Sequence, residues 1–346
     1  MSISILKKYI LFSNKPGTKL LVPSTSFMVA LFPTRILLED LESKASKEII
    51  IDTQGPIDKF EVRLDLEKNR IEFSGKSSLG FFRFHIFQEN NSVHLLLKKG
   101  PLKGFCLNDS TVIKPNEPLT LIHNIKTSVK PFEKLSLGSH KALELSKIED
   151  RKDLKEIVPI LFSLYQKIHS SSKSHREGTA KLLDFPKEKV ALEKQFLALY
   201  AYGFNGIVPT LTDNYQGYVS SSEKVSNDAS PLVLLKEFGK KVRSLFIRQE
   251  NNTFYLLETL LRPFASGRMI NIDTDYGIFN LQWSEKTLRK VIFQSKVDDQ
   301  IAIVPQKQVK SFRLKTSRKD KGITLKPRDL FSIKKNQTVY LDRFER

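Results

Sequence analysis

The sequence predicts a mainly β protein with a helical middle, in which a short helical region joins two antiparallel β-sandwich-like domains. Apolar and polar residues alternate with a period of two in the first and last thirds of the chain, and helical spacing separates these two regions. Phe is also abundant, with 24 of 346 residues, and it favours half-buried sheet surfaces. A chain of this length fits two or three domains, which we place at residues 1–135, 136–229 and 230–346.

Short strands joined by polar turns are expected between residues 24 and 121. Phe60, Val62 and Leu64 alternate with charged residues, which is typical of a strand with one solvent-facing side. The residues Glu89-Asn90-Asn91-Ser92 indicate a hairpin turn between the next two strands. His85, on the first of these strands, is expected on its polar side.

The middle of the chain carries helix signals. Asp153 and Glu156 resemble a capping box, and Pro159 is expected to kink or restart the helix that follows. A second helix is expected to begin at Pro186 and end at Gly203. Ser230-Pro231 combines a favoured N-cap residue with Pro at the first helical position, which predicts a third helix.

After the third helix the strand period returns. Asn251-Asn252 lies between two apolar segments and predicts a hairpin, although the usual Gly is missing. Phe279, Leu281 and Trp283 share one face of a later strand, so Trp283 is predicted to be a core residue rather than a platform for a sugar ring. Further short strands continue to residue 341 and complete a second antiparallel sandwich.

The formal net charge of +19 favours an anionic partner, and its distribution is uneven. Between Gln306 and Lys335 there are eight Lys and three Arg against two Asp, a net +9. The charges keep to the polar positions of strands, so the alternative interpretation is an ordinary solvated face. The candidate contacts to an anionic partner are Lys310, Arg313, Lys315, Arg318 and Lys319.

The sequence also bears on the compartment. Cys106 is the single cysteine, so no intramolecular disulfide can form, which is typical of a reducing compartment. No apolar window approaches the roughly 18 residues of a membrane span, and we find no signal peptide. We therefore expect a cytoplasmic protein without a membrane span. The sequence does not indicate an oligomeric state.

The order of elements from Ser230 to Leu341 resembles that of a known domain. It runs from a capped helix to the hairpin around Asn251-Asn252, then through Ala265-Ser266-Gly267-Arg268-Met269 into the strand that ends at Trp283. This order resembles the C-terminal β-sandwich of α-L-fucosidase-type glycoside hydrolases, which are built on a ring of helix hairpins. The resemblance implies a carbohydrate-related protein. Residues 143–242 are too few for a complete catalytic ring, so the implied protein is reduced, inactive or limited to sugar binding.

Glycoside hydrolysis requires two carboxylates that face each other across the scissile bond. The acidic residues of the middle region show no spacing that selects such a pair, so we assign no catalytic residue and leave open whether the protein is an enzyme. The alternative function is a non-enzymatic scaffold or binding protein that uses the basic C-terminal face for nucleic acid or another anionic partner.

Two loops carry groups that bind sugars. One contains His140, and the other contains Asp213, Asn214, Tyr215 and Gln216, whose amide, carboxylate and phenol groups can bind sugar hydroxyls and ring faces. The alternative interpretation is a pair of ordinary turns in which Asp and Asn bond the local backbone. The six His residues are scattered and show no metal-ligand spacing, so we expect neither a metal nor a cofactor.

Overall fold

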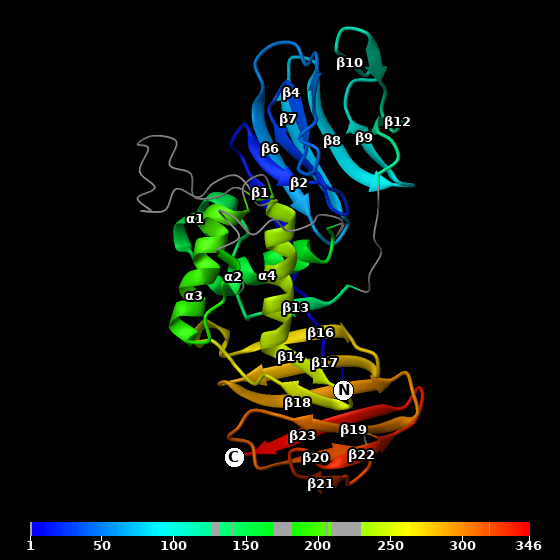
Figure 1. Ribbon diagram of the computed structural model, residues 1–346. Coiled ribbons are helices and arrows are strands. Elements are labelled where there is room, and N and C mark those ends of the chain that lie inside the picture. The colour runs from blue at the N-terminus through cyan, green and yellow to red at the C-terminus, as the bar shows by residue number, and fades with distance from the viewer. Residues whose placement is uncertain are drawn as a thin grey trace.

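The computed structural model describes residues 2–125, 132–139, 141–168, 182–204, 207–208, 230–317 and 319–346. It confirms a mainly β protein with a helical middle. Two β lobes occupy opposite ends of an elongated molecule, and a layer of helices lies between them (Figure 1).

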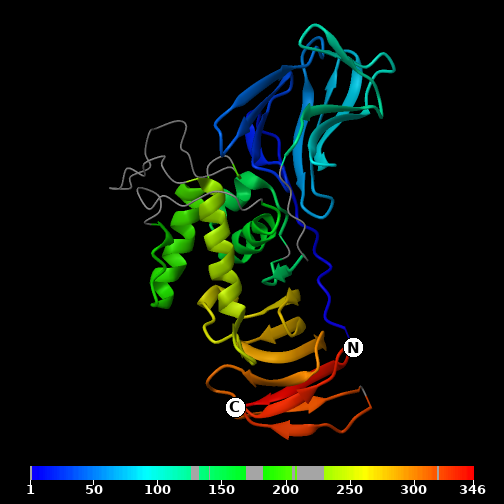
Figure 2. The same cartoon turned by 45° about the vertical axis from the view of Figure 1, so that its right-hand side comes forward.

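The N-terminal lobe consists of two antiparallel sheets and a small hairpin, and its two sheets form separate layers in Figure 2. The six-stranded sheet has the spatial order β1 (Ile10–Ser13), β6 (Asp58–Asp65), β7 (Arg70–Ser77), β8 (Gly80–Glu89), β9 (Ser92–Lys99) and β12 (Pro118–Ile122). The four-stranded sheet has the order β2 (Thr18–Leu21), β3 (Phe27–Leu31), β4 (Arg35–Asp40) and β5 (Ser46–Ile50). The hairpin consists of β10 (Phe105–Leu107) and β11 (Thr111–Ile113).

The strand pattern of this lobe follows the sequence prediction, with one exception. Phe60, Val62 and Leu64 are buried, and Asn90 and Asn91 adopt positive φ angles of 47° and 57° in the turn between β8 and β9. His85 was expected on the polar side of β8, but only 5% of it is exposed. It pairs in register with Glu72 on β7 and Leu96 on β9, so its neighbours in the sheet shield the imidazole from solvent.

The helical layer contains α1 (Leu145–Arg151), α2 (Leu154–Tyr165), α3 (Lys189–Ala198) with a π-helical turn at Leu199–Gly203, and α4 (Pro231–Phe246). Asp153 caps α2 as predicted, with its carboxylate accepting a hydrogen bond from the Lys155 N–H. Glu156 does not complete the capping box, because it is buried and accepts a hydrogen bond from Arg151 instead. Pro159 does not restart α2, which is one helix from Leu154 to Tyr165.

The C-terminal lobe is also built from two sheets. The larger sheet has the order β13 (Lys134–Ser136), β16 (Gly267–Asp273), β17 (Gly277–Ser284), β18 (Thr287–Ser295), β23 (Thr338–Glu345), β20 (Ser311–Lys315) and β21 (Ile323–Leu325). The smaller sheet has the order β14 (Ile247–Glu250), β15 (Thr253–Leu256), β19 (Asp299–Val304) and β22 (Leu330–Ile333). Arg262–Phe264 forms a 3-10 turn before β16.

Two features of this lobe test the sequence predictions directly. The hairpin at Asn251-Asn252 is confirmed, and Asn251 supplies the positive φ of 52° that Gly would otherwise provide. The smaller sheet is not wholly antiparallel as expected, because β15 and β19 pair in parallel. These two strands are distant in sequence, so no local turn imposes an antiparallel direction on them.

A buried polar junction at Glu133 connects the helices to the C-terminal lobe. The Glu133 carboxylate accepts hydrogen bonds from Arg243 Nε on α4, at 2.9 and 3.0 Å, and from the Asp273 N–H at the end of β16, at 3.1 Å. The Gln166 side chain of the α2 C-cap bonds both the N–H and the carbonyl of Glu133, each at 2.6 Å. Burial raises the pKa of Glu133, and the Arg243 guanidinium opposes that shift.

A second polar junction connects the N-terminal lobe to β13 and to the residues after α2. Lys134 forms an ion pair of 2.7 Å with Glu67, which follows β6. The buried ammonium of Lys167 donates hydrogen bonds to the Leu66 carbonyl and to the Asn69 side chain. Burial lowers the pKa of Lys167 to about 8.

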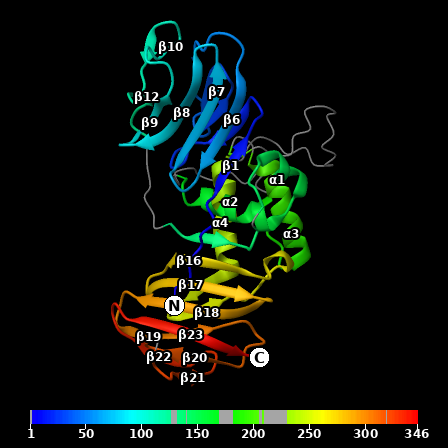
Figure 3. The same cartoon turned by 180° about the vertical axis from the view of Figure 1, so that it is seen from behind.

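The N-terminal segment runs between the two lobes. In Figure 3 the N-terminus lies over the larger C-terminal sheet, and the chain passes from there to β1 in the other lobe. Arg268 on β16 donates a hydrogen bond of 2.9 Å to the Ser4 carbonyl, and the Tyr9 hydroxyl donates one of 2.5 Å to the Leu135 carbonyl. This segment therefore covers part of the outer face of the larger sheet. Among the helices that the structure describes, none is long and apolar enough to cross a membrane.

Helices α2 and α4 approach closely at Gly239. A Cβ added there would lie 2.0 Å from the ring of Tyr165, so Gly239→Ala forces the two helices apart. We predict a loss of about 2 kcal/mol in the free energy of unfolding, measured by urea denaturation. The steric clash outweighs the higher helix propensity of Ala compared with Gly. The control, Ser244→Ala at an exposed site on α4, should change it by less than about 0.5 kcal/mol. A neutral or stabilising Gly239→Ala would contradict this packing.

The Glu133 junction predicts a charge-dependent loss of stability. Arg243→Met leaves the buried Glu133 carboxylate without its cation, so we expect unfolding to require about 2–4 kcal/mol less. Adding Glu133→Gln to that variant removes the unpaired charge and should restore part of the loss. Arg248→Met, which breaks more exposed pairs with Glu250 and Glu258, should cost less than about 1 kcal/mol. If the double variant were no more stable than Arg243→Met, the unpaired charge of Glu133 would not be the cause of the loss.

His85 predicts an acid-sensitive step in stability. Burial, together with Arg70, lowers its pKa from 6.5 to about 4. Between these pH values His85 is therefore protonated in the unfolded chain and neutral in the folded protein. The free energy of unfolding should therefore fall by about 3 kcal/mol as the pH drops from 6.5 to 4. His85→Gln should remove this part of the pH dependence, whereas His94→Gln should keep it. Urea midpoints measured across this pH range provide the test, and a His85→Gln profile parallel to the wild type would refute the assignment.

Candidate functional site

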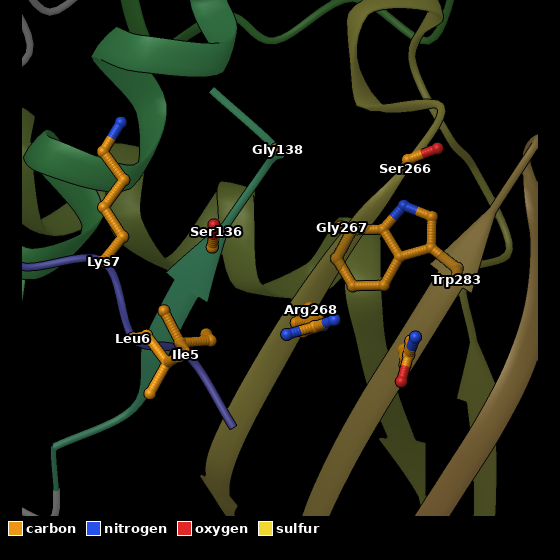
Figure 4. A pocket seen from close by; sticks show the side chains of 10 residues that line it. Ile5, Leu6, Lys7, Ser136, Gly138, Ser266, Gly267, Arg268 and Trp283 are labelled. Atoms are coloured by element: carbon orange, nitrogen blue, oxygen red, sulfur yellow. The ribbon is translucent and has the colours of Figure 1, made fainter. Parts of the chain in front are cut away.

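A pocket lies where the N-terminal segment crosses the edge of the larger C-terminal sheet (Figure 4). Its volume is about 520 Å³, which is within the size range of small-molecule sites. The residues that line it come from the N-terminal segment, from β13 and the residues after it, and from β16 and β17: Ile5, Leu6, Lys7, Ser136, Gly138, Ser266, Gly267, Arg268, Gln282 and Trp283.

Three of these residues form a row across neighbouring strands. Arg268 on β16 pairs in register with Ser136 on β13 and with Gln282 on β17. Side chains that are directly opposite in antiparallel strands have Cβ atoms about 4.5–5.5 Å apart, so the hydroxyl, guanidinium and amide are neighbours on one face. Arg268 is exposed, and one of its nitrogens donates to the Ser4 carbonyl at 2.9 Å.

The indole of Trp283 forms the floor of the pocket rather than an open platform. Trp283 is 1% exposed, and its Nε1 donates a hydrogen bond of 2.8 Å to the Phe264 carbonyl, so the prediction of a core role is confirmed. The ring packs directly over Gly267, where an added Cβ would lie 2.4 Å from it. Glycine at this position therefore lets the indole approach the β16 backbone.

Lys7 connects the pocket to a buried carboxylate in the helical layer. Its ammonium donates a hydrogen bond of 2.6 Å to the Ser139 carbonyl and points away from Arg268 in Figure 4. The Ser139 hydroxyl and Arg151 both donate to the fully buried carboxylate of Glu156, at 3.1 and 2.8 Å. Burial lowers the pKa of Lys7, and the nearby Glu156 opposes that shift. Glu156 is therefore a structural carboxylate held by its neighbours.

The candidate sugar-binding residues from the sequence lie outside the described residues. This applies to His140 and to the whole group Asp213, Asn214, Tyr215 and Gln216. Gly138, which belongs to the same loop as His140, does line the pocket.

Three acidic residues of the helical layer have structural contacts. Asp153 caps α2, Glu188 caps α3, and Glu193 accepts a hydrogen bond from the Arg262 N–H. No group of His, Cys, Asp or Glu among the described residues is placed to hold a metal ion.

A second candidate site is a basic surface at one end of the C-terminal lobe. Hydrogen bonds bring its segments together: Gln306 and Gln308 donate to the Lys286 carbonyl, the Lys310 N–H donates to the Glu345 carbonyl, and the Arg328 N–H donates to the Ile303 carbonyl. We call this surface the basic end and define it by six exposed cations: Lys286, Lys307, Lys310, Lys326, Arg328 and Arg346.

The six cations of the basic end form no ion pair with any carboxylate that the structure describes. Arg346 bonds the Glu285 carbonyl and the Thr287 hydroxyl, which are uncharged groups. The nearby carboxylates are otherwise engaged: Glu285 pairs with Arg289, and Asp329 accepts the Lys326 N–H. The electrostatic potential at the basic end is therefore positive, and its exposed cations are accessible to an anionic partner.

The structure separates the basic residues that the sequence grouped. Lys310 belongs to the basic end, whereas Lys319 lies in the turn at the opposite end of β20, a strand about 17 Å long. Arg313 is neutralised by Asp342 through two hydrogen bonds of 2.8 Å, and Lys315 lies further along the same strand. Arg318 is outside the described residues. The turn near Lys319 also contains Asp320, which accepts hydrogen bonds from Thr316 and Gly322, so its charge is mixed.

Sequence reasoning missed the residues that make both sites spatial units. The pairing of Arg268 with Ser136 depends on contacts between segments more than 100 residues apart. Lys286 and Arg346 lie outside the densest basic stretch and join Lys310 only through the fold. No protein-family model matches the chain, and no curated protein matches it in sequence.

Proposed function

We propose that this protein is a non-enzymatic binding protein whose basic end contacts the phosphate backbone of nucleic acid. The observation that carries the proposal is the set of six exposed cations on four separate segments, none with a described carboxylate partner. Phosphate contacts of this kind dominate nucleic-acid affinity and do not read sequence. The net charge of +19 adds a long-range attraction.

The geometry of the basic end favours backbone contacts over base recognition. Its cations are mainly Lys on turns, which bind phosphate as point charges, and its defining residues include no aromatic side chain for base stacking. We therefore expect similar affinity for different sequences.

The test is a fluorescence-anisotropy titration of a labelled 30-nucleotide duplex at several NaCl concentrations. Neutralising four cations of the basic end, Lys307→Gln, Lys310→Gln, Lys326→Gln and Arg328→Gln, should weaken binding and reduce the slope of log K against log salt by about 3. The matched control neutralises Lys319, Lys321, Lys334 and Lys335 at the other end of the lobe and changes the net charge by the same amount. It should have a much smaller effect.

Three outcomes of this titration would sink the proposal. They are an affinity that is indifferent to salt, equal effects of the two quadruple variants, and binding to phosphatidylserine vesicles or to an acidic polypeptide without binding to DNA. Circular dichroism and urea midpoints of both variants establish that each is folded.

A second candidate function is carbohydrate binding. The observation that favours it is the pocket between the N-terminal segment and the larger C-terminal sheet, which we call the junction pocket. Its hydroxyl, amide and guanidinium groups are those that bind sugar hydroxyls, and Ile5 and Leu6 supply an apolar wall. The resemblance of the C-terminal third to sandwiches of fucosidase-type hydrolases gives the same direction. We do not extend this candidate to hydrolysis, because none of the described residues that line the pocket is a carboxylate.

A further inference from the structure

We propose that the junction pocket binds a small hydroxylated anion, a sugar phosphate or a uronic acid. This inference rests on the second candidate function, carbohydrate binding, and narrows it to a charged ligand. The argument follows from the charge, the geometry and the walls of the pocket.

The charge of the pocket is positive. Among the described residues, its lining contains one Lys and one Arg, and no Asp or Glu. The carboxylate beside it, Glu156, is already held by Arg151 and Ser139, so it does not compensate the Arg268 guanidinium. An anionic group is the ligand charge that this lining favours.

The geometry assigns the anion to Arg268. A guanidinium has five N–H donors, and the contact with the Ser4 carbonyl uses one of them. That contact also holds the side chain between the N-terminal segment and the sheet. The remaining donors can bind a carboxylate or phosphate at two points, which is the arrangement that Arg prefers.

The neighbours of Arg268 favour a hydroxylated ligand. Ser136 and Gln282 flank it on either side in register, and Ser266 lies two residues earlier at the mouth of the pocket. An amide and hydroxyls can both donate to and accept from the hydroxyl groups of a sugar. An inorganic anion would leave these groups bonded only to water.

The apolar wall favours a ligand with a carbon ring. Leu6 is 87% exposed although it lines the pocket, and Ile5, the residue before it, lines the pocket as well. A ring that packed against Leu6 would bury apolar surface that the unliganded protein leaves in solvent.

The test uses isothermal titration calorimetry of the full chain with four probes: glucose 6-phosphate, glucuronate, glucose and inorganic phosphate. We expect glucose 6-phosphate or glucuronate to bind at least tenfold more tightly than glucose and than inorganic phosphate. Arg268→Gln should weaken that binding at least tenfold, and Ser266→Tyr, which adds a ring to the lining of the pocket, should abolish it. Arg289→Gln, an exposed Arg outside the pocket, is the matched control and should bind as the wild type does.

The outcomes separate this inference from the function on which it rests. If glucose bound as tightly as the charged sugars, the claim that the ligand is anionic would be wrong, and carbohydrate binding would stand. If inorganic phosphate bound as tightly as glucose 6-phosphate, the claim that the pocket recognises the sugar ring would be wrong. No binding of any probe, or binding that neither Arg268→Gln nor Ser266→Tyr changes, would overturn both. Circular dichroism of each variant verifies that it is folded.

Discussion

The buried carboxylate of Glu133 is the interaction on which the arrangement of the lobes depends. It accepts hydrogen bonds from α4 and from the end of β16, while its backbone is bonded by the C-cap residue of α2. A carboxylate taken out of water must be compensated on every side, so each of these partners has to stay in place. The side chain and backbone of this one residue thereby connect two helices to a sheet.

This constraint also builds the pocket. Residues directly after Glu133 form β13, which pairs with β16 and places Ser136 beside Arg268. The N-terminal segment is held against the same strand by the hydrogen bond between Tyr9 and the Leu135 carbonyl. The pocket thus results from the way β13 and the N-terminal segment lie against β16. Its position between separate parts of the fold is typical of ligand sites.

The two candidate sites draw on different properties of the same lobe. The basic end depends on charges left without carboxylate partners on turns, whereas the pocket depends on a cross-strand row and an overlying segment. They share no residue, so each can be altered while the other is kept. The two proposals can therefore be tested independently of each other.

The sequence by itself determined the mainly β class, the helical middle, both Asn-Asn hairpins and the buried position of Trp283. These features follow from local rules: a period of two, side chains that tolerate positive φ, and capping residues. Only the tertiary structure decided the burial of His85 and Glu156, the parallel pairing of β15 with β19, and the meeting of Ser136, Arg268 and Gln282. It also separated Lys310 from Lys319. Such outcomes depend on contacts between distant segments, whose free energies no local pattern records.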